Sequence, residues 1–391
     1  MRRLCKVIVA TALITPLILF LLFGANANAA DGKITATKLE TTAQSAVLMD
    51  GNGTVLFEKN AHQPLPPASV TKSMTLLLAV EAVEQGKIKL TDEVSTSENA
   101  WRQGGSQIWL EPGERMTVKE LMTAIAVVSA NDAAVALMEH IYGSEQAAVD
   151  AMNQRAADLG LKNTHFANVN GLPVAGHYLS AYDTALIVKE AIKHPLYMEL
   201  CGIKETWLRN GKNWLVNTNK LLWWYKGADG LKTGWTEEAK YCFAGTAKRD
   251  GLRLIAVVFA TPEPRSHLRE SMKLMDWGFA NYIAAPVVEK GSPVEKMKVN
   301  NGTEKEVQLI AAKDITLLLA KGQNKAIQKR FVAGPAVNAP VAEGQKCGEL
   351  IIEKDGKEVD KVDLVAAKTV PRIGFGQIIS NMFYELFSIN R

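Results

Sequence analysis

The alternation of apolar and polar residues divides the chain into two parts. Up to about Tyr282, long helical patterns alternate with strand patterns, whereas short alternating runs between Gly, Asn and Pro turns fill residues 284–372. The first part predicts a domain of the α/β (α+β) class, and the second predicts a small all-β domain resembling a sandwich. A length of about 360 residues without the N-terminal segment is too large for one ordinary core, which also favours two domains.

Several elements can be predicted from local patterns. Residues 45–59 predict a hairpin that turns at Asp50-Gly51-Asn52-Gly53. Three further strands are expected at 231–236, 240–251 and 252–260, followed by an amphipathic helix over 265–282. Helices are expected between the hairpin and the three later strands.

One predicted helix carries an unexpected pair of polar residues. From Met74 to Val83 the chain is apolar apart from a threonine and a glutamate, which predicts a helix that is buried on nearly every side. Its first turn nonetheless contains Ser69 and Lys72. Taken alone, a serine at a helix start is usually an N-cap, and a lysine there usually extends its ammonium group to water. A functional reading therefore depends on other motifs.

The N-terminus has the pattern of an export signal. A cationic start is followed by an apolar run from Val7 to Phe23 and by alternating small residues up to Ala29. This pattern predicts a secretory signal peptide over residues 1–29, cleaved after Ala29 or Ala30. A retained membrane span is the alternative, but Pro16 and the small-residue pattern favour cleavage. The mature protein is thus expected to be exported, to the periplasm or the cell-wall side of the membrane.

Charge and cysteine content exclude several classes of protein. The formal net charge of +4 falls to +1 when the three cations of the signal segment are removed, so nucleic acid is not expected as a partner. Cys201, Cys242 and Cys347 are too few for a disulfide framework and are expected to be buried apolar residues, although one pair could bridge. No His/Cys cluster has metal-ligand spacing, so neither a metal nor a cofactor is expected.

Three short motifs occur in a fixed order along the chain. They are S-x-x-K at Ser69 and Lys72, S-x-N at Ser129 and Asn131, and K-T-G at Lys232, Thr233 and Gly234. Each tripeptide or tetrapeptide is common by itself. The ordered trio in an exported chain is a signature of acyl-serine enzymes that bind penicillin.

The first motif supplies a nucleophile and its base. A serine hydroxyl attacks only when a base takes its proton, and side chains three residues apart on a helix meet. Lys72 can be that base only when it is neutral, and both burial and the charge of Lys232 would lower its pKa. The backbone N–H of Ser69, at the helix start, can form half of an oxyanion hole.

The other two motifs complete a substrate site. Asn131 offers an amide to orient a peptide, and Ser129 a hydroxyl that can pass a proton to a leaving amine. A K-T-G sequence on an edge strand offers main-chain pairing, with Lys232 and Thr233 available for a carboxylate. Gly234 is expected to let the substrate approach closely.

Beyond these motifs, the chain resembles the low-molecular-mass penicillin-binding proteins, the serine-type D-Ala-D-Ala carboxypeptidases of peptidase class S11. The resemblance covers nearly all of the mature chain, including "NDAAVALME", "GLPVAGHYLSAYDTALI" and "DGLKTGWT". It implies a transpeptidase/β-lactamase-like catalytic domain at 30–283 and a β-sandwich-like domain at 284–372. It also implies removal of the terminal D-alanine from peptidoglycan stem peptides in cell wall biogenesis, with β-lactam antibiotics as covalent inhibitors.

The resemblance assigns roles by matching motif. Ser69 would be the nucleophile, Lys72 the general base and Ser129 the proton relay, while the backbone N–H of Trp235 would be the second oxyanion donor. The substrate-binding residues would be Asn131, Lys232, Thr233, Gly234 and Trp235.

Two further positions have alternative interpretations. Asp183 matches an aspartate found near such sites, but it can equally be an acidic residue at a helix N-terminus. Some family members place an arginine before the "LLW" stretch to hold the substrate carboxylate, whereas this chain has Asn217-Thr218-Asn219-Lys220. That leaves Thr233, Lys232 or Lys220 for the carboxylate.

Two other classes of protein were weighed. A class A β-lactamase shares the three motifs but needs a glutamate in an E-x-x-L-N pattern to activate the deacylating water, and no such pattern occurs between Asn131 and Lys232. A non-catalytic cell-wall scaffold would tolerate decayed motifs, but all three are intact. Both classes are therefore disfavoured against a carboxypeptidase.

The C-terminal tail at 373–391 has an apolar stripe. Six large apolar residues recur at helical spacing over about three turns, which is too short to span a bilayer. They are Ile378, Ile379, Met382, Phe383, Leu386 and Phe387. The tail is expected to lie on the outer face of the cytoplasmic membrane, and the alternative is a helix packed on the β-domain.

Overall fold

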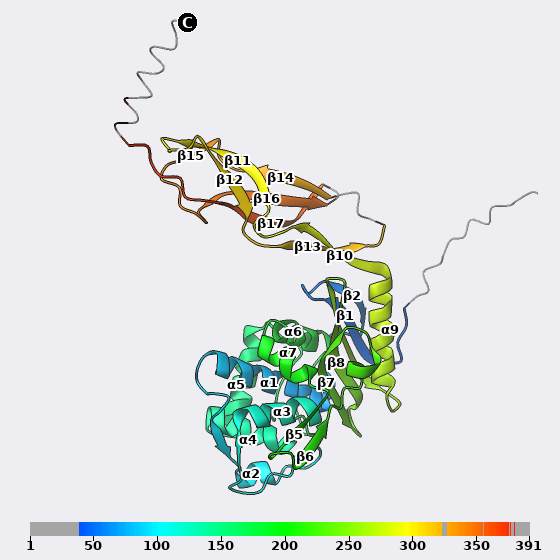
Figure 1. The fold of residues 1–391 in the computed structure, drawn as a ribbon. Helices are drawn as coiled ribbons and strands as arrows, with labels where there is room; N and C mark the ends of the chain where they lie inside the picture. Colours follow the sequence, from blue (N-terminus) through cyan, green and yellow to red (C-terminus); the bar gives the residue numbers. More distant parts are fainter. Residues whose placement is uncertain (1–38, 323–326, 355, 375, 377–378, 380–391) are drawn as a thin grey trace, which may run out of the picture. The chain divides into compact units, whose positions relative to one another are not determined.

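The computed structural model describes residues 39–322, 327–354, 356–374, 376 and 379 (Figure 1). The predicted signal peptide and nearly all of the tail lie outside these residues. Within them, no helix combines the length and the apolar character needed to cross a membrane.

The N-terminal domain is organised around a five-stranded antiparallel sheet with the order β2-β1-β9-β8-β7. The predicted hairpin and the three later strands all belong to it, and β7, which carries the K-T-G motif, lies at the edge as expected. The strand bounds are β1 Ser45–Asp50, β2 Val55–Lys59, β7 Ala228–Thr236, β8 Lys240–Arg249 and β9 Leu252–Thr261.

Both faces of this sheet are covered, which explains why β1 is buried along its whole length and β8 and β9 are buried over most of theirs. Val47 and Met49 of β1 pack into one core, whereas Ala46 and Leu48 pack into the other. Because side chains alternate across a strand, a strand covered on both faces reads as continuously apolar. The first core contains most of the helices, and the second contains α9 (Ser266–Asn281) (Figure 1).

The remaining helices build the first core, except α8, whose Leu221 packs into the second core. Helix α1 is buried from Lys72 to Val80, in agreement with the pattern that predicted it. The other bounds are η1 Ala68–Thr71, α1 Lys72–Glu84, α2 Glu98–Trp101, α3 Val118–Val128, α4 Asn131–Tyr142, α5 Glu145–Asp158, α6 Ala181–Ala191, α7 Pro195–Gly202 and α8 Leu221–Trp224.

Two short hairpins complete the N-terminal domain. One pairs β3 (Glu93–Ser95) with β4 (Arg115–Thr117), and the other pairs β5 (Glu205–Leu208) with β6 (Asn213–Val216). The second hairpin lies between α7 and α8 in the chain and leads directly into the segment before the "LLW" stretch. It was not predicted, because strands of four residues give little periodicity.

The C-terminal domain consists of strands only, as predicted. A six-stranded sheet has the order β14-β16-β17-β12-β11-β15, and β10 pairs with β13. Alternate residues such as Leu309, Ile352 and Leu364 form its core. The bounds are β10 Tyr282–Val288, β11 Pro293–Asn300, β12 Glu306–Ala311, β13 Ile315–Ala320, β14 Ile327–Val332, β15 Ala336–Asn338, β16 Lys346–Lys354 and β17 Lys357–Ala366.

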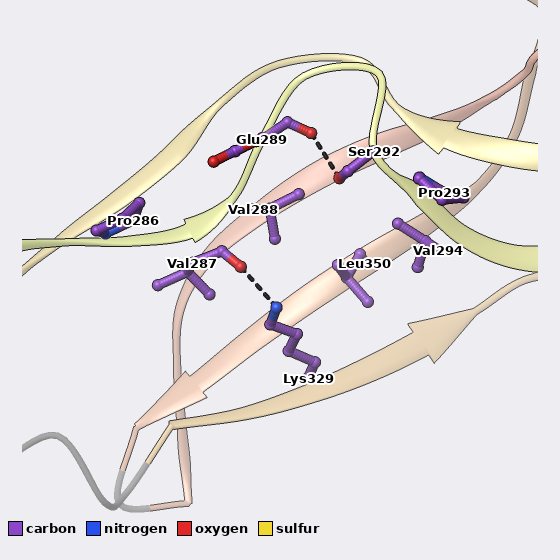
Figure 2. Close-up of a pocket in the computed structure, with 9 residues that line it drawn as sticks. All are labelled: Pro286, Val287, Val288, Glu289, Ser292, Pro293, Val294, Lys329 and Leu350. Atoms are coloured by element: carbon purple, nitrogen blue, oxygen red, sulfur yellow. Dashed lines mark hydrogen bonds between the residues drawn. The ribbon is translucent and has the colours of Figure 1, made fainter.

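A groove of about 470 Å³ opens on this β-domain (Figure 2). Its polar groups are paired with backbone carbonyls of the groove itself: Lys329 Nζ donates to Val287 O at 2.5 Å, and Ser292 Oγ donates to Glu289 O at 2.6 Å (Figure 2).

The three cysteines that the structure describes are free thiols. Cys201 and Cys242 are buried, as expected for small apolar residues, while Cys347 is only half-buried. The alternative of a disulfide between two of them is therefore wrong.

Candidate active site

Ser69 lies in a tight turn that precedes the buried helix. The sequence predicted a serine in the first turn of an α-helix, but Ser69 belongs to the 3₁₀ turn η1 and α1 begins at Lys72. In a 3₁₀ turn, side chains three residues apart are eclipsed, which brings this pair closer than an α-helix would. Lys72 Nζ lies 3.1 Å from Ser69 Oγ.

Lys72 is fully buried and its amine contacts three oxygens. Besides Ser69 Oγ, Nζ reaches the Asn131 side-chain carbonyl Oδ1 and, at 2.6 Å, the backbone carbonyl of Asn170. Carbonyl oxygens only accept hydrogen bonds, whereas a hydroxyl can also donate. A neutral amine has two N–H donors and one lone pair, so its donors would go to the two carbonyls and its lone pair would face Ser69. This arrangement suits a base that takes the serine proton.

The electrostatics of the site favour the neutral form of Lys72. Burial lowers its pKa well below the usual range, and the positive charge of Lys232 lowers it further, while Asp132 opposes both. Burial also lowers the pKa of Lys232, to about 7. These are the two causes that the sequence suggested, and burial is the larger.

Ser129 is held at the end of α3 in a strained backbone conformation. Thr117 and Glu120 form a reciprocal capping box that starts this helix, and Ser129 ends it with φ of 64° in the left-handed region. Its side chain is buried, and among the described residues its Oγ has no hydrogen-bond partner. A buried hydroxyl without a partner is available to hydrogen-bond a bound molecule.

Asn131 begins the next helix and its amide is already occupied. Its Oδ1 accepts from Lys72 and its Nδ2 donates to Gly104 O at 2.6 Å. We expected this amide to orient a substrate peptide. In the structure it orients Lys72 and the 104–110 segment, so contact with a substrate would require Nδ2 to leave Gly104 or to share its hydrogen.

The K-T-G strand runs close to the nucleophile. A Cβ atom on Gly234 would lie 2.9 Å from Pro67 O and 3.1 Å from the backbone nitrogens of Ser69 and Val70. Glycine at this position therefore lets β7 approach the η1 turn. From the sequence, we expected the same glycine to let the substrate approach. Lys232 on the same strand is buried, and its Nζ donates to Thr233 O at 2.9 Å.

Thr233 and Lys220, two of the residues considered for binding the substrate carboxylate, have different contacts. Thr233 Oγ1 lies 2.9 Å from Thr218 Oγ1, so two hydroxyls meet at the edge of β7. Lys220 Nζ instead donates to Asn217 O at 2.9 Å and lies 4.8 Å from the centre of the Trp223 ring. These contacts favour Thr233, with Thr218, over Lys220.

Sequence reasoning missed the residues that shape the turn around Ser69. Ala68 has φ of 48°, and its carbonyl accepts a hydrogen bond from Thr71 Oγ1 at 2.8 Å. A Cβ on Gly171 would lie 1.9 Å from Ala68 O, so only glycine fits there. His177 Nδ1 accepts from Ala167 N, which leaves Nε2–H to donate to Thr71 Oγ1 at 2.7 Å. Burial lowers the pKa of His177 to about 4, so this histidine is neutral at pH 7.

Asp132 and Asp183 both have structural contacts. Asp132 Oδ2 accepts from the backbone nitrogens of Ile108 and Leu110 at 3.1 and 3.0 Å, which fixes the segment beside Asn131. Asp183 lies in the first turn of α6 and accepts from Asn163 N at 2.6 Å. The reading of Asp183 as an acidic residue at a helix start therefore fits its contacts.

A separate cluster of Glu81, Glu190 and His194 has the composition of a metal site. Arg155 lies within it, however, and donates to Glu81 Oε1 at 2.6 Å and to Glu190 Oε1 at 3.3 Å. The guanidinium already supplies the positive charge that these carboxylates need, so we assign no metal there.

Comparisons with known proteins match both domains. The family model for D-alanyl-D-alanine carboxypeptidase, Peptidase S11, matches residues 32–263, and the model for the C-terminal domain of penicillin-binding protein 5 matches residues 282–372. The D-alanyl-D-alanine carboxypeptidase DacF of Bacillus subtilis is 44% identical over 350 residues, which cover 88% of this chain and 90% of DacF.

Two solved structures are also similar. Penicillin-binding protein 5 of Haemophilus influenzae gives a TM-score of 0.71 at 35% identity and covers 85% of this chain and 98% of its own. A peptidoglycan synthesis regulatory factor (PBP3) of Streptococcus pneumoniae gives a TM-score of 0.74 at 30% identity. The match covers 85% of this chain and 100% of the PBP3 chain.

The close approach of β7 to the η1 turn generates one prediction. Gly234→Ala would force backbone atoms of Pro67 and Ser69 to move, and displacements near 1 Å at a reacting group can cost ~10²-fold in rate. We expect acylation by a labelled penicillin to slow by about that factor. The control is Gly202→Ala, where the nearest atom to the new Cβ is 3.9 Å away. Equal acylation rates in the two variants would contradict the packing role of Gly234.

A second prediction concerns the pH dependence of stability. The pKa of Lys232 is about 7 in the folded chain against an ordinary 10.5, so between these pH values the unfolded chain binds a proton that the folded chain lacks. The free energy of unfolding therefore rises with pH across this window.

Lys232→Met removes this titration and should flatten the rise between about pH 7 and pH 10, as measured by urea denaturation at several pH values. Lys72, whose pKa is also lowered, keeps a residual slope in the variant. An unchanged slope would mean that Lys232 is charged and solvated in the folded protein.

Proposed function

The chain belongs to the D-alanyl-D-alanine carboxypeptidase family, and from that premise we propose that Ser69 and Lys72 carry out its reaction as nucleophile and general base. As a member of this family the protein is a serine-type D-Ala-D-Ala carboxypeptidase that binds penicillin and acts in cell wall biogenesis. The observation that carries the assignment is the contact between a fully buried Lys72 amine and Ser69 Oγ at 3.1 Å.

In the first step, Ser69 Oγ attacks the carbonyl carbon between the last two D-alanines while neutral Lys72 takes its proton. The developing oxyanion is held by the backbone N–H groups of Ser69 and Trp235. Ser129, whose buried hydroxyl is free of other partners among the described residues, passes a proton to the departing amine. The C–N bond breaks, D-alanine leaves, and Ser69 carries the acyl group.

Before the second step, the Lys72 ammonium returns its proton to Ser129, which leaves Lys72 neutral again. Water then attacks the acyl carbon while Lys72 takes its proton, and the acyl C–O bond breaks as Lys72 passes that proton to Ser69 Oγ, which restores both residues. The terminal carboxylate of the substrate is bound by Thr233 with Lys232, and Asn131 and Gly234 border the peptide on either side of the nucleophile. A β-lactam has a similar carbonyl and carboxylate, but its leaving amine stays tethered. It is therefore expected to acylate Ser69 and to leave slowly.

The ends of the chain complete the proposal. Residues 1–29 would export the protein, 30–283 would form the catalytic domain and 284–372 the β-domain, and 373–391 would hold the enzyme on the outer face of the cytoplasmic membrane. The apolar stripe of the tail supports this attachment, because each large apolar side chain contributes on the order of 1.5–3 kcal/mol when buried.

The catalytic assignment is tested with Lys72→Arg. Arginine keeps the positive charge but does not deprotonate in this pH range, so acylation by penicillin and hydrolysis of a diacyl-D-Ala-D-Ala peptide should both fall by ~10² to 10⁴. The control is Lys119→Arg, at an exposed position of α3, which should behave as wild type. In the wild-type protein, peptide mapping should place the penicillin label on Ser69.

Near-normal acylation of Lys72→Arg would refute the role of Lys72 as the base. A label on Ser129 would refute the nucleophile. Absence of peptide hydrolysis by wild-type protein that still binds penicillin would favour a binding function instead.

The membrane assignment is tested with vesicles. The mature full-length protein should float with lipid vesicles and should stay bound in high salt, because screening weakens charge attraction and leaves apolar burial intact. A chain truncated before Gly374 should remain soluble and still bind penicillin. Recovery of the full-length protein in the soluble fraction at low salt would show that the tail is not an anchor.

A further inference from the structure

The tryptophans of this protein are exposed to an unusual degree. The chain has eight, and seven of them have more than a third of their surface exposed: Trp101, Trp109, Trp207, Trp214, Trp223, Trp224 and Trp235. An indole would normally be largely buried, since burial of an aromatic side chain removes 150–250 Å² from water in typical cases. Exposed aromatic residues gathered on one part of a protein usually mark a binding surface.

Two of these indoles form a pair on the β5/β6 hairpin. Trp207 and Trp214 are directly opposite in the register, their ring centroids are 6.2 Å apart, and their planes differ by 26°. The alternate residues Leu208 and Leu215 are buried and fasten the inner face of the hairpin to the core. The indoles therefore stand on the outer face, where they are 58% and 56% exposed.

A third indole is displayed by the segment next to the hairpin. Trp109 is 74% exposed and has φ of 54°, a left-handed conformation that is unfavourable for a bulky residue. Asp132 fixes the residues on both sides of it through their backbone nitrogens. Arg209, in the hairpin turn, donates to Trp109 O at 3.2 Å and to Glu114 Oε1 at 2.6 Å. Arg209 thus links the segment that carries Trp109 to the hairpin that carries Trp207 and Trp214.

We refer to Trp109, Trp207 and Trp214 as the tryptophan surface. Both segments that carry these indoles are connected to residues of the candidate active site. The backbone of Asp132 directly follows that of Asn131, and Trp214 precedes Thr218, which contacts Thr233, by four residues. Four residues of strand span about 13 Å. A five-residue peptide spans at most ~17 Å, so a substrate peptide bound at Ser69 can have its other end at this surface.

We propose that the tryptophan surface binds the glycan strand to which the substrate peptide is attached. This inference rests on the proposed function, because the peptide must be bound at Ser69 for its carbohydrate end to reach the indoles. The axial C–H bonds of a pyranose ring meet the electron-rich face of an indole favourably, and two neighbouring, nearly parallel indoles offer adjacent platforms for sugar rings.

The charges beside the indoles are mixed. Glu205 is exposed, and the alternation along β5 puts it on the same outer face as Trp207. The hairpin turn carries two cations, of which Arg209 is paired with Glu114 and Lys212 is exposed. The glycan is therefore assigned as the occupant from the reach of the substrate peptide to which it is attached, and a lipid surface is the alternative that vesicle binding tests.

The test compares the hydrolysis of a polymeric and a short substrate by variants of the three tryptophans. In Trp109→Leu/Trp207→Leu/Trp214→Leu, apolar bulk is kept but the aromatic faces are lost. We expect KM for stem peptides on polymeric glycan to rise at least tenfold, and kcat/KM for a short diacyl-D-Ala-D-Ala peptide to stay within about twofold. The corresponding triple Tyr variant should recover most of the loss. Trp224→Ala, an exposed indole outside the surface, should handle both substrates as wild type does.

Binding can be measured without catalysis. Protein acylated by penicillin, whose active site is blocked, should still cosediment with peptide-free glycan strands, and the triple Leu variant should not. Equal KM values for the polymer in wild type and the triple Leu variant would overturn the proposal, as would vesicle binding that the Leu variant keeps. If wild type fails to hydrolyse the short peptide, it is the proposed function that fails, and glycan cosedimentation of the acylated protein still decides this inference.

Discussion

The burial of one amine, that of Lys72, is the constraint on which the rest of the site depends. Its side chain is completely enclosed, and a charged ammonium group in such a place would be costly. The protein lowers this cost by surrounding Nζ with three oxygens and by favouring the neutral form. Two of those oxygens can only accept, and the third is the hydroxyl of Ser69, the residue that we propose as the nucleophile. The burial of Lys72, its lowered pKa and its contact with Ser69 therefore belong to the same arrangement.

The fold supports this arrangement from several directions. The η1 turn presents Ser69, the end of α3 presents Ser129 in a left-handed conformation, and β7 approaches both because Gly234 has no side chain. Ala68 and Ser129 both have positive φ angles, and so does Trp109 in the segment fixed by Asp132. Such strain persists only where the surrounding structure enforces it.

How much could be predicted from the sequence depended on the range of the interactions. The sheet strands, α1 and α9 were predicted because their patterns are long and local, and the resemblance that predicted the family and the fold class is confirmed by the comparisons. The 3₁₀ turn at Ser69 and the short β5/β6 hairpin were not, because neither produces a clear period. Contacts between distant segments, such as Gly171 against Ala68 or His177 against Thr71, leave no local signal. Gly171 and His177 nevertheless lie within the "GLPVAGHYLSAYDTALI" stretch that carried the resemblance.

The central claim is that Lys72 is neutral in the resting enzyme at physiological pH. It is tested most directly by nuclear magnetic resonance of protein labelled with ¹³C and ¹⁵N at lysine side chains, with the Lys72 resonance followed from pH 5 to pH 11. Lys232 has a pKa near 7, so a Lys232→Met sample distinguishes the two titrations. The account predicts that the Lys72 resonance has the chemical shift of a neutral amine at pH 7. A Lys72 amine that is fully protonated at pH 7 and titrates near its ordinary value would contradict it.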